Sequence, residues 1–251
     1  MNERVTIEIC VGDLESALAA GDGGADRVEL CDNLAVGGTT PSAGTIAEAC
    51  RRLRIPVHVL IRPRAGDFLP TAAELAAMRH DIELARSLGA SGVVLGLLCP
   101  DGTVDRERTA RLVELARPLS VTFHKAFDQV RDPAEALEAL IALGVDRVLT
   151  SGCRPTALEG SDALRNLADQ ARGRIAILAG GRLSAENIET ILSRAGVREI
   201  HLGSAVTRLM QSAMTHSPND GSELTWSGVD PQKVREIVEL VCRLGRSRNG
   251  Y

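Results

Sequence analysis

The chain has 251 residues and a formal net charge of −4, and its basic and acidic residues are mixed along the sequence. The absence of a basic block argues against a nucleic-acid or anionic-membrane partner, and no apolar run reaches the roughly 18 residues of a transmembrane helix. Aromatic residues make up only 2%, so aliphatic side chains must fill the core, as is typical of parallel α/β proteins. The first residues, MNERVTIEIC, lack a long apolar signal-peptide core, and we expect a cytoplasmic protein.

Eight short aliphatic runs recur along the chain, and amphipathic stretches lie between them. The runs begin near Arg4, Ala25, Ile55, Ala90, Leu119, Val145, Arg174 and Val197. Their mean spacing is about 30 residues, which is the length of one strand followed by one helix. The pattern therefore predicts eight strands that alternate with helices.

Helix signals are clear in several of the intervening stretches. Residues 71–90 begin with Thr71 as N-cap and Glu74 at the capping-box position. Residues 132–145 open with an aspartate cap and a proline at the first helical position. Further helices are expected over 13–25, 184–196 and 230–245.

Eight strand–helix units in this length predict a single α/β domain over 1–251, a closed (β/α)₈ TIM-type barrel. A doubly wound open sheet is the alternative. The irregular stretch at about 204–229 contains the only tryptophan and is expected to form a long loop over the barrel mouth, before the last helix.

Polar residues gather where the expected strands end, which in such barrels is where active sites lie. They are Glu8, Cys10, Glu29, Cys31, Arg62, Arg64, Asp67, His124, Lys125, Asp128, Ser151 and His201. Because side chains alternate along a strand, Glu8 shares a face with Cys10, and Glu29 shares one with Cys31. If these faces line the barrel, carboxylates and thiols converge. We expect Arg62 and Arg64 to be the counter-charges, since unpaired buried carboxylates are costly.

Glycines after the last two expected strands suggest an anion site. Gly180 and Gly181 follow the seventh strand, and Gly203 and Ser204 follow the eighth. Backbone N–H groups at these places hold phosphate in many sugar-phosphate barrels. The structural alternative is that these glycines only form turns.

The six cysteines are far apart and include no CxxC pair, so a structural zinc site of paired ligands is not supported. Taken singly, each cysteine is more often a packed thiol, and an isolated histidine such as His58 or His80 is more often packed or exposed than functional. A buried Glu–Arg pair is as often structural as functional.

Five motifs resemble, in order and spacing, those of the CutC family: GGADRVELCDNLAVGGTTPSAG, IPVHVLIRPRAGDF, VTFHKAFD, DRVLTSG and AGGRLSAENI. The resemblance covers nearly the whole chain. It implies a TIM-type barrel, a role in copper homeostasis and Cu(I) binding through cysteine, with Cys31 as the cysteine of the VELC motif. It also implies a shared polar set: Glu8, Glu29, Arg62, Arg64, Asp67, His124, Asp128, Ser151 and His201.

Three departures from the family pattern stand out. Lys125 occupies the position where the family usually has arginine, and Ala65 stands where it usually has glycine. Lysine keeps the charge but lacks the two-pronged guanidinium geometry. Near Leu202 and Gly203 the family often has cysteine or serine, and no thiol is present there.

Two hypotheses of different class follow. The first is a Cu(I)-binding protein in which the thiolates of Cys10 and Cys31 bind the ion near the barrel mouth, since Cu(I) is soft and prefers sulfur. The second is an enzyme with lyase- or isomerase-type acid–base chemistry on a small anionic or sugar-phosphate-like ligand. Its catalytic candidates are Glu8, Glu29, Arg62, Arg64, His124, Asp128 and His201. This hypothesis also allows a divalent metal held by Glu and His side chains. A homodimer is the default expectation for the assembly.

Overall fold

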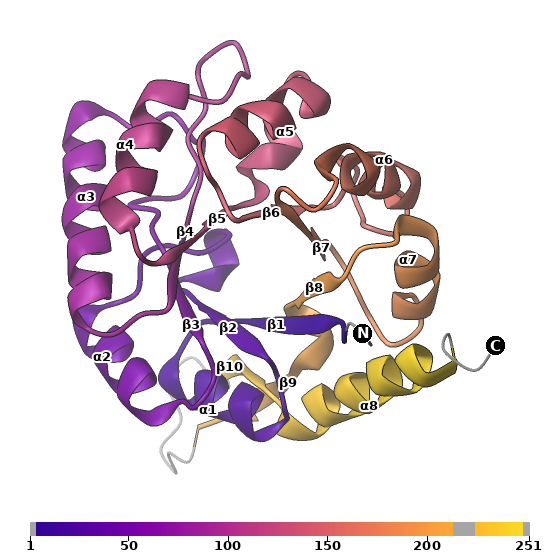
Figure 1. Ribbon diagram of the computed structural model, residues 1–251. Helices are drawn as coiled ribbons and strands as arrows, with labels where there is room; N and C mark the ends of the chain where they lie inside the picture. Colours follow the sequence, from indigo (N-terminus) through magenta and orange to yellow (C-terminus); the bar gives the residue numbers. More distant parts are fainter. Residues whose placement is uncertain (1–3, 213–223, 248–251) are drawn as a thin grey trace.

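Figure 1 shows the computed structural model, which describes residues 4–212 and 224–247. Eight parallel strands form a closed barrel in sequence order, with β1 next to β8. The strands are β1 (Thr6–Val11), β2 (Arg27–Leu30), β3 (Val57–Leu60), β4 (Gly92–Leu95), β5 (Ser120–Phe123), β6 (Arg147–Thr150), β7 (Ala176–Gly180) and β8 (Glu199–Leu202). The predicted TIM-type barrel is confirmed, and the open-sheet alternative is wrong.

Helices surround the barrel (Figure 1). They are α1 (Leu14–Asp22), α2 (Ala43–Arg52), α3 (Ala72–Ser87), α4 (Arg106–Ala116), α5 (Pro133–Ala142), α6 (Ser161–Ala171), α7 (Ile188–Ala195) and α8 (Pro231–Ser247), with short 3₁₀ turns η1 (Leu34–Val36), η2 (Lys125–Gln129) and η3 (Ser204–Val206). The capping box of Thr71 and Glu74 forms at the start of α3. Within the described ranges, none of these helices combines the length and apolarity needed to cross a bilayer.

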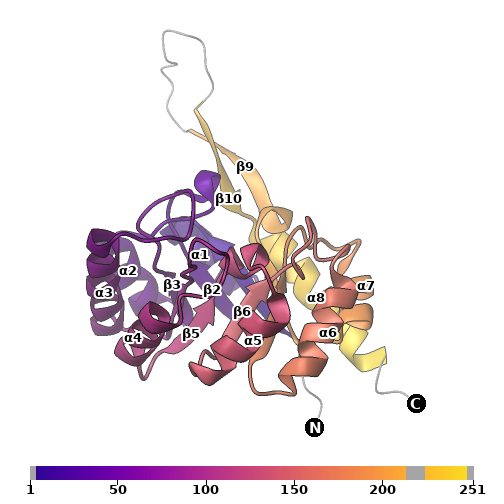
Figure 2. The same ribbon diagram turned by 90° about the horizontal axis from the view of Figure 1, so that it is seen from above.

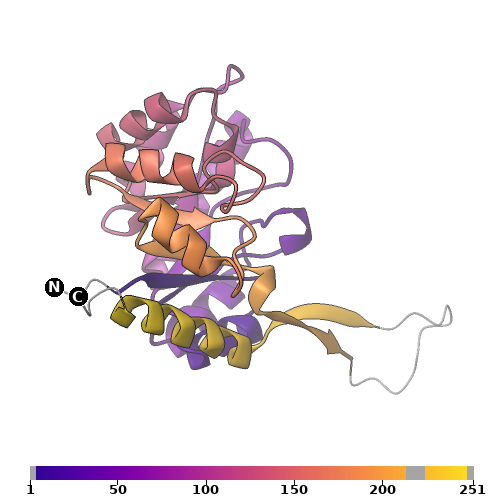
Figure 3. The same cartoon turned by 90° about the vertical axis from the view of Figure 1, so that its right-hand side faces the viewer.

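The segment 204–229, expected to be a long loop, contains a β-hairpin instead. Strands β9 (Thr207–Gln211) and β10 (Thr225–Val229) pair antiparallel, and Trp226 lies opposite Met210. Residues 213–223 of the expected loop lie outside the described residues. The two strands stand out from the barrel (Figures 2 and 3). The prediction missed them because they lie within a polar stretch rather than in a continuous aliphatic run.

The base of the hairpin is tied to the first helix. The backbone N–H of Val229 donates to Ser16 Oγ at 3.2 Å, and this hydroxyl in turn donates to Asp13 Oδ2 at 2.8 Å. Asp13 also caps α1 by accepting from the backbone N–H of Ser16. One polar cluster therefore fixes both the start of α1 and the position of β10.

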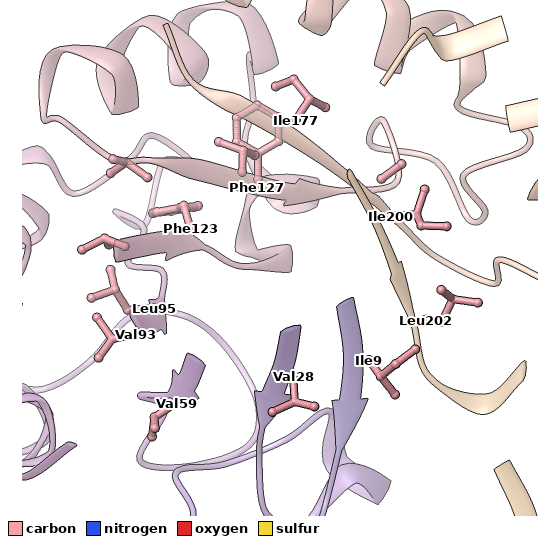
Figure 4. Packing of buried hydrophobic residues seen from close by; sticks show 14 of the residues in the cluster. Ile9, Val28, Val59, Val93, Leu95, Phe123, Phe127, Ile177, Ile200 and Leu202 are labelled. Atoms are coloured by element: carbon pink, nitrogen blue, oxygen red, sulfur yellow. The ribbon is translucent and has the colours of Figure 1, made fainter. Parts of the chain in front are cut away.

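The barrel strands separate an aliphatic layer from a polar interior. Alternate residues such as Ile9, Val28 and Val59 belong to the main apolar core, part of which is shown in Figure 4. The intervening positions include buried polar residues: Glu8, Arg27, Glu29, His58, Thr122 and His124. The aliphatic layer provides the hydrophobic stabilisation, while the interior carries groups whose burial requires polar partners.

Candidate functional site

A cavity of about 790 Å³ opens at the carboxyl ends of the barrel strands. Of the predicted site residues it is lined by Cys10, Glu29, Cys31, Arg62, His124, Gly181, His201, Gly203 and Ser204, and also by Lys125, Arg182, Phe68 and Trp226. Glu8, Arg64, Asp128 and Gly180 are not in its lining. Of the nine residues of the shared polar set, the cavity lining therefore includes Glu29, Arg62, His124 and His201.

Two thiols lie together in this cavity. The Sγ atoms of Cys10 and Cys31 are 3.8 Å apart. Cys10 lies on β1 opposite Glu29 of β2, and Cys31 directly follows β2. The ligand atoms of Cys10, Glu29 and Cys31 all lie within 4.8 Å of one another. The alternation of side chains on two adjacent strands is what places these three groups on the interior face.

A chain of charged side chains runs from this cluster into the barrel. His201 Nδ1 lies 2.8 Å from Glu8 Oε1, and the other oxygen of Glu8 accepts from Arg27 Nε at 2.5 Å. Arg27 then donates to Glu199 at 2.7 Å, and Arg147 donates to the same oxygen of Glu199 at 2.5 Å. Glu8 is only 1% exposed, so these partners compensate a charge that would otherwise be strongly unfavourable there.

These contacts set the protonation of Glu8 and His201. Burial by itself would raise the pKa of Glu8, but the hydrogen bond with His201 and the charge of Arg27 hold it well below its usual value. Burial would likewise lower the pKa of His201, but bonds to Cys10 and Glu8 raise it well above its usual value. At neutral pH the pair is therefore a carboxylate and an imidazolium.

The three groups next to His201 also differ in protonation. The hydrogen bond with Cys31 lowers the pKa of Cys10 despite burial, and His201 lowers it further. The same sulfur–sulfur bond, with burial, raises the pKa of Cys31. Burial and the neighbouring Cys10 raise the pKa of Glu29. The cluster therefore combines one thiol whose pKa is lowered with a second thiol and a carboxyl group whose pKa values are raised.

The expectation that Arg62 and Arg64 neutralise Glu8 and Glu29 is wrong. Arg62 donates to the backbone carbonyls of Val36, Gly38 and Gly66. Arg64 forms ion pairs with Asp67 and Glu74, outside the cavity lining. Both arginines follow β3, so their side chains hold the loops above the barrel rather than reach into it.

Arg27 is the counter-charge of Glu8, and it was not among the predicted site residues. Arg147 and Glu199 extend the same network and were also missed. All three occur at the beginnings of strands, where no site was expected. Period-two alternation could have pointed to Arg27, because it shares a face of β2 with Glu29.

His124 lines the cavity in its neutral form. Burial, together with the charge of Arg62, lowers its pKa to about 3. Its Nδ1 accepts a hydrogen bond from the backbone N–H of Ala126 at 3.1 Å, so the ring proton is on Nε2. The ring lies over Gly96, where an added Cβ would approach its atoms to 2.4 Å. Gly96 therefore makes room for the imidazole.

The contacts of Asp128 and Gly180 support the fold around the site. Asp128 accepts hydrogen bonds from Thr150, Ser151 and Cys153, which fixes the turn after β6. A Cβ at Gly180 would lie 2.5 Å from Leu149 Cδ1, so this glycine allows two strands to pack closely. Gly181, Gly203 and Ser204 line the cavity, as an anion site would require.

Comparisons with known proteins agree with these features. The CutC family model matches residues 5–206. A human copper homeostasis protein cutC homolog is 48% identical over 202 residues, which are 80% of this chain and 74% of that protein. A CutC family protein from Chromobacterium violaceum is 49% identical over 230 residues, or 92% of each chain.

Solved structures show the same relationship. The crystal structure of CutC from Streptococcus agalactiae has a TM-score of 0.76 at 37% identity, covering 80% of this chain and 98% of that one. N-(5'-phosphoribosyl)anthranilate isomerase from Pyrococcus furiosus has a TM-score of 0.58 at 17% identity, covering 95% and 99%, and shares the fold alone. From its motifs, its barrel and these matches, the chain belongs to the CutC family.

Proposed function

We propose that this chain binds Cu(I) within the barrel mouth through the thiolates of Cys10 and Cys31, as part of copper homeostasis. The observation that carries the proposal is the 3.8 Å separation of the two sulfurs. A metal–thiolate bond is about 2.3 Å long, so two sulfurs on one ion lie no more than about 4.6 Å apart. The pair therefore needs little rearrangement to bind one ion.

The chemistry of the surroundings supports a soft monovalent ion. Cu(I) prefers thiolate to carboxylate, and Glu29, with its raised pKa, is a poor oxygen ligand at neutral pH. His201, beside Cys10, favours the thiolate that binding requires. All six cysteines are free, which suits the reducing conditions of a cytoplasmic protein. The names of the human and streptococcal relatives refer to copper homeostasis.

An anaerobic titration with Cu(I) against a competing chelator tests this proposal. Loss of an outer-shell partner weakens a metal site by about 10- to 100-fold, so we expect Cys10→Ser and Cys31→Ser each to lose at least about 100-fold. Cys50→Ser, on α2 and outside the cavity lining, is the matched control. A double variant that binds as tightly as the parent would show that the two thiols do not hold the ion.

The size of the cavity favours a second candidate, an acid–base enzyme on a small anionic or sugar-phosphate-like substrate. About 790 Å³ lies within the range of small-molecule pockets and greatly exceeds the needs of one ion. The raised pKa values of Glu29 and His201 favour their protonated forms, which suits general acids. Gly181, Gly203 and Ser204 line the cavity, which supports a phosphate subsite there.

Thermal stabilisation by a panel of sugar phosphates and organic acids tests the second candidate. We expect at least one compound to raise the melting temperature of the parent, and Ser204→Asp to abolish the shift by repelling an anion. If no compound stabilises the protein while Cu(I) binding is intact, the enzyme hypothesis is wrong.

A further inference from the structure

Arg62 is a buried cation at the cavity wall that has no carboxylate partner among the described residues. It is only 8% exposed, and it donates to the carbonyl oxygens of Val36, Gly38 and Gly66. Carbonyl dipoles solvate the guanidinium but do not cancel its charge. A buried charge is energetically unfavourable unless a counter-ion neutralises it.

The hydrogen-bond inventory of Arg62 shows where a counter-ion fits. Nη1 uses both hydrogens on Val36 and Gly38, and Nη2 uses one on Gly66. Nε is buried and has no hydrogen-bond partner within residues 4–212 and 224–247. The hydrogen of Nε and one hydrogen of Nη2 are therefore left for a ligand. Guanidinium N–H groups bind the oxygens of a carboxylate through charge-assisted hydrogen bonds.

Two other donors line the same cavity. His124 is neutral, and its proton is on Nε2 because Nδ1 accepts from Ala126. Lys125 lies at the rim with its side chain 47% exposed, 3.5 Å from Asp128 Oδ2. This wall of the cavity therefore presents hydrogen-bond donors and positive charge, which are the requirements of a carboxylate subsite.

The carboxylate subsite adjoins the thiol pair through Gly38. The carbonyl of Gly38 accepts from Arg62 Nη1 at 2.8 Å. A Cβ built on the same residue would lie 3.5 Å from Cys31 Sγ. Guanidinium and thiol therefore flank one residue, and both Arg62 and Cys31 line the cavity.

We propose that the mouth binds Cu(I) as its complex with a small thiol that carries a carboxylate, and that Arg62 and Lys125 bind that carboxylate. This inference rests on the proposed Cu(I) function and explains why an ion site has so large a cationic cavity. The copper then transfers by ligand exchange. Its bonds to the carrier sulfur break, and bonds to Cys10 and Cys31 form. A cysteine that enters as a thiol gives its proton to the departing carrier thiolate, and copper remains Cu(I) throughout.

The test compares two thiol donors of Cu(I) under anaerobic conditions. Glutathione carries carboxylates, and 2-mercaptoethanol carries none. For each donor we take the ratio of the apparent affinity of the parent to that of a variant. Dividing the glutathione ratio by the 2-mercaptoethanol ratio removes the donor's own affinity for copper and any common effect of the substitution on the copper site.

For Arg62→Gln we expect this double ratio to be about tenfold or more, the effect of one charge-assisted hydrogen bond. For Lys125→Gln we expect a smaller double ratio that is still above one. If Arg62→Gln does not fold, the Lys125→Gln ratio alone tests whether the site binds the carrier's carboxylate. Arg111→Gln, on the exposed side of α4, should give a ratio of one.

A third donor, the Cu(I)–acetonitrile complex, separates the two levels of the proposal. If the parent takes copper from acetonitrile but the double ratio is one for Arg62→Gln and Lys125→Gln, the carrier inference is overturned and the copper function stands. If the parent takes copper from no donor, the copper function fails and the inference fails with it.

Discussion

The buried imidazole of His124 should make the protein lose stability as the pH falls from 7 to 5. Its pKa is about 3 in the folded protein and 6.5 in an unfolded chain. Below pH 6.5 the imidazole is therefore protonated in the unfolded state, whereas in the folded state it stays neutral until near pH 3. The folded state is then increasingly disfavoured through this window.

The magnitude follows from the two pKa values. From pH 6.5 to pH 5 the free energy of unfolding falls by about 1.36 kcal/mol per pH unit, which gives about 2 kcal/mol. At pH 5 the result is insensitive to the folded pKa as long as that value lies below about 4. His124→Asn removes the titration, and its side-chain oxygen can still accept from the backbone N–H of Ala126.

Urea unfolding of parent and variant at pH 7 and pH 5 measures the effect. We expect the drop in unfolding free energy to be about 2 kcal/mol smaller in His124→Asn, while contributions from other groups cancel in the difference. His80→Asn, at a side chain that is 84% exposed, serves as the control. Equal drops in parent and His124→Asn would refute the assignment of a neutral, buried imidazole.

Three further predictions concern the barrel interior and its mouth. Gly96→Ala places a Cβ 2.4 Å from the His124 ring, so urea unfolding should show a loss of about 1–3 kcal/mol, whereas Gly44→Ala, in the open on α2, should gain about 0.5–1 kcal/mol. Glu8→Gln leaves Arg27 and His201 without their shared carboxylate, and we expect a loss of about 3–5 kcal/mol at pH 7, against no change for Glu15→Gln on the surface of α1. Trp226, the only tryptophan, lines the cavity, so saturation with Cu(I) should alter its fluorescence, and unchanged emission would place the ion elsewhere.

Most of the barrel could be predicted because its signals are local. Each strand is a short aliphatic run, and alternation along β1 and β2 is enough to place Glu8 with Cys10 and Glu29 with Cys31. The hairpin of β9 and β10 was missed because its two strands pair only with each other and have little apolar content.

The partnership of Glu8 with His201 could not be predicted, because it depends on how strands far apart in the sequence are aligned. Glu8 meets His201 across the closing pair of β1 and β8, a separation of 193 residues. Arg27 binds Glu8 because these residues are directly opposite in the β1–β2 register. Arg62 is also an arginine, but it lies after the end of its strand, whereas Arg27 lies at the start of one. Arg62 therefore donates hydrogen bonds to loop carbonyls.

Gly92 at the start of β4 and Gly96 directly after it limit how this barrel can vary. Gly92 lies opposite His58 in the register of β3 and β4, and a Cβ there would lie 2.6 Å from the imidazole. Gly96 has the same relation to His124. Because neither glycine has a side chain, the rings of His58 on β3 and of His124 after β5 both have room within the barrel. Among related sequences we therefore expect coupled exchange: a larger residue at either glycine should occur together with a smaller residue in place of the histidine it faces.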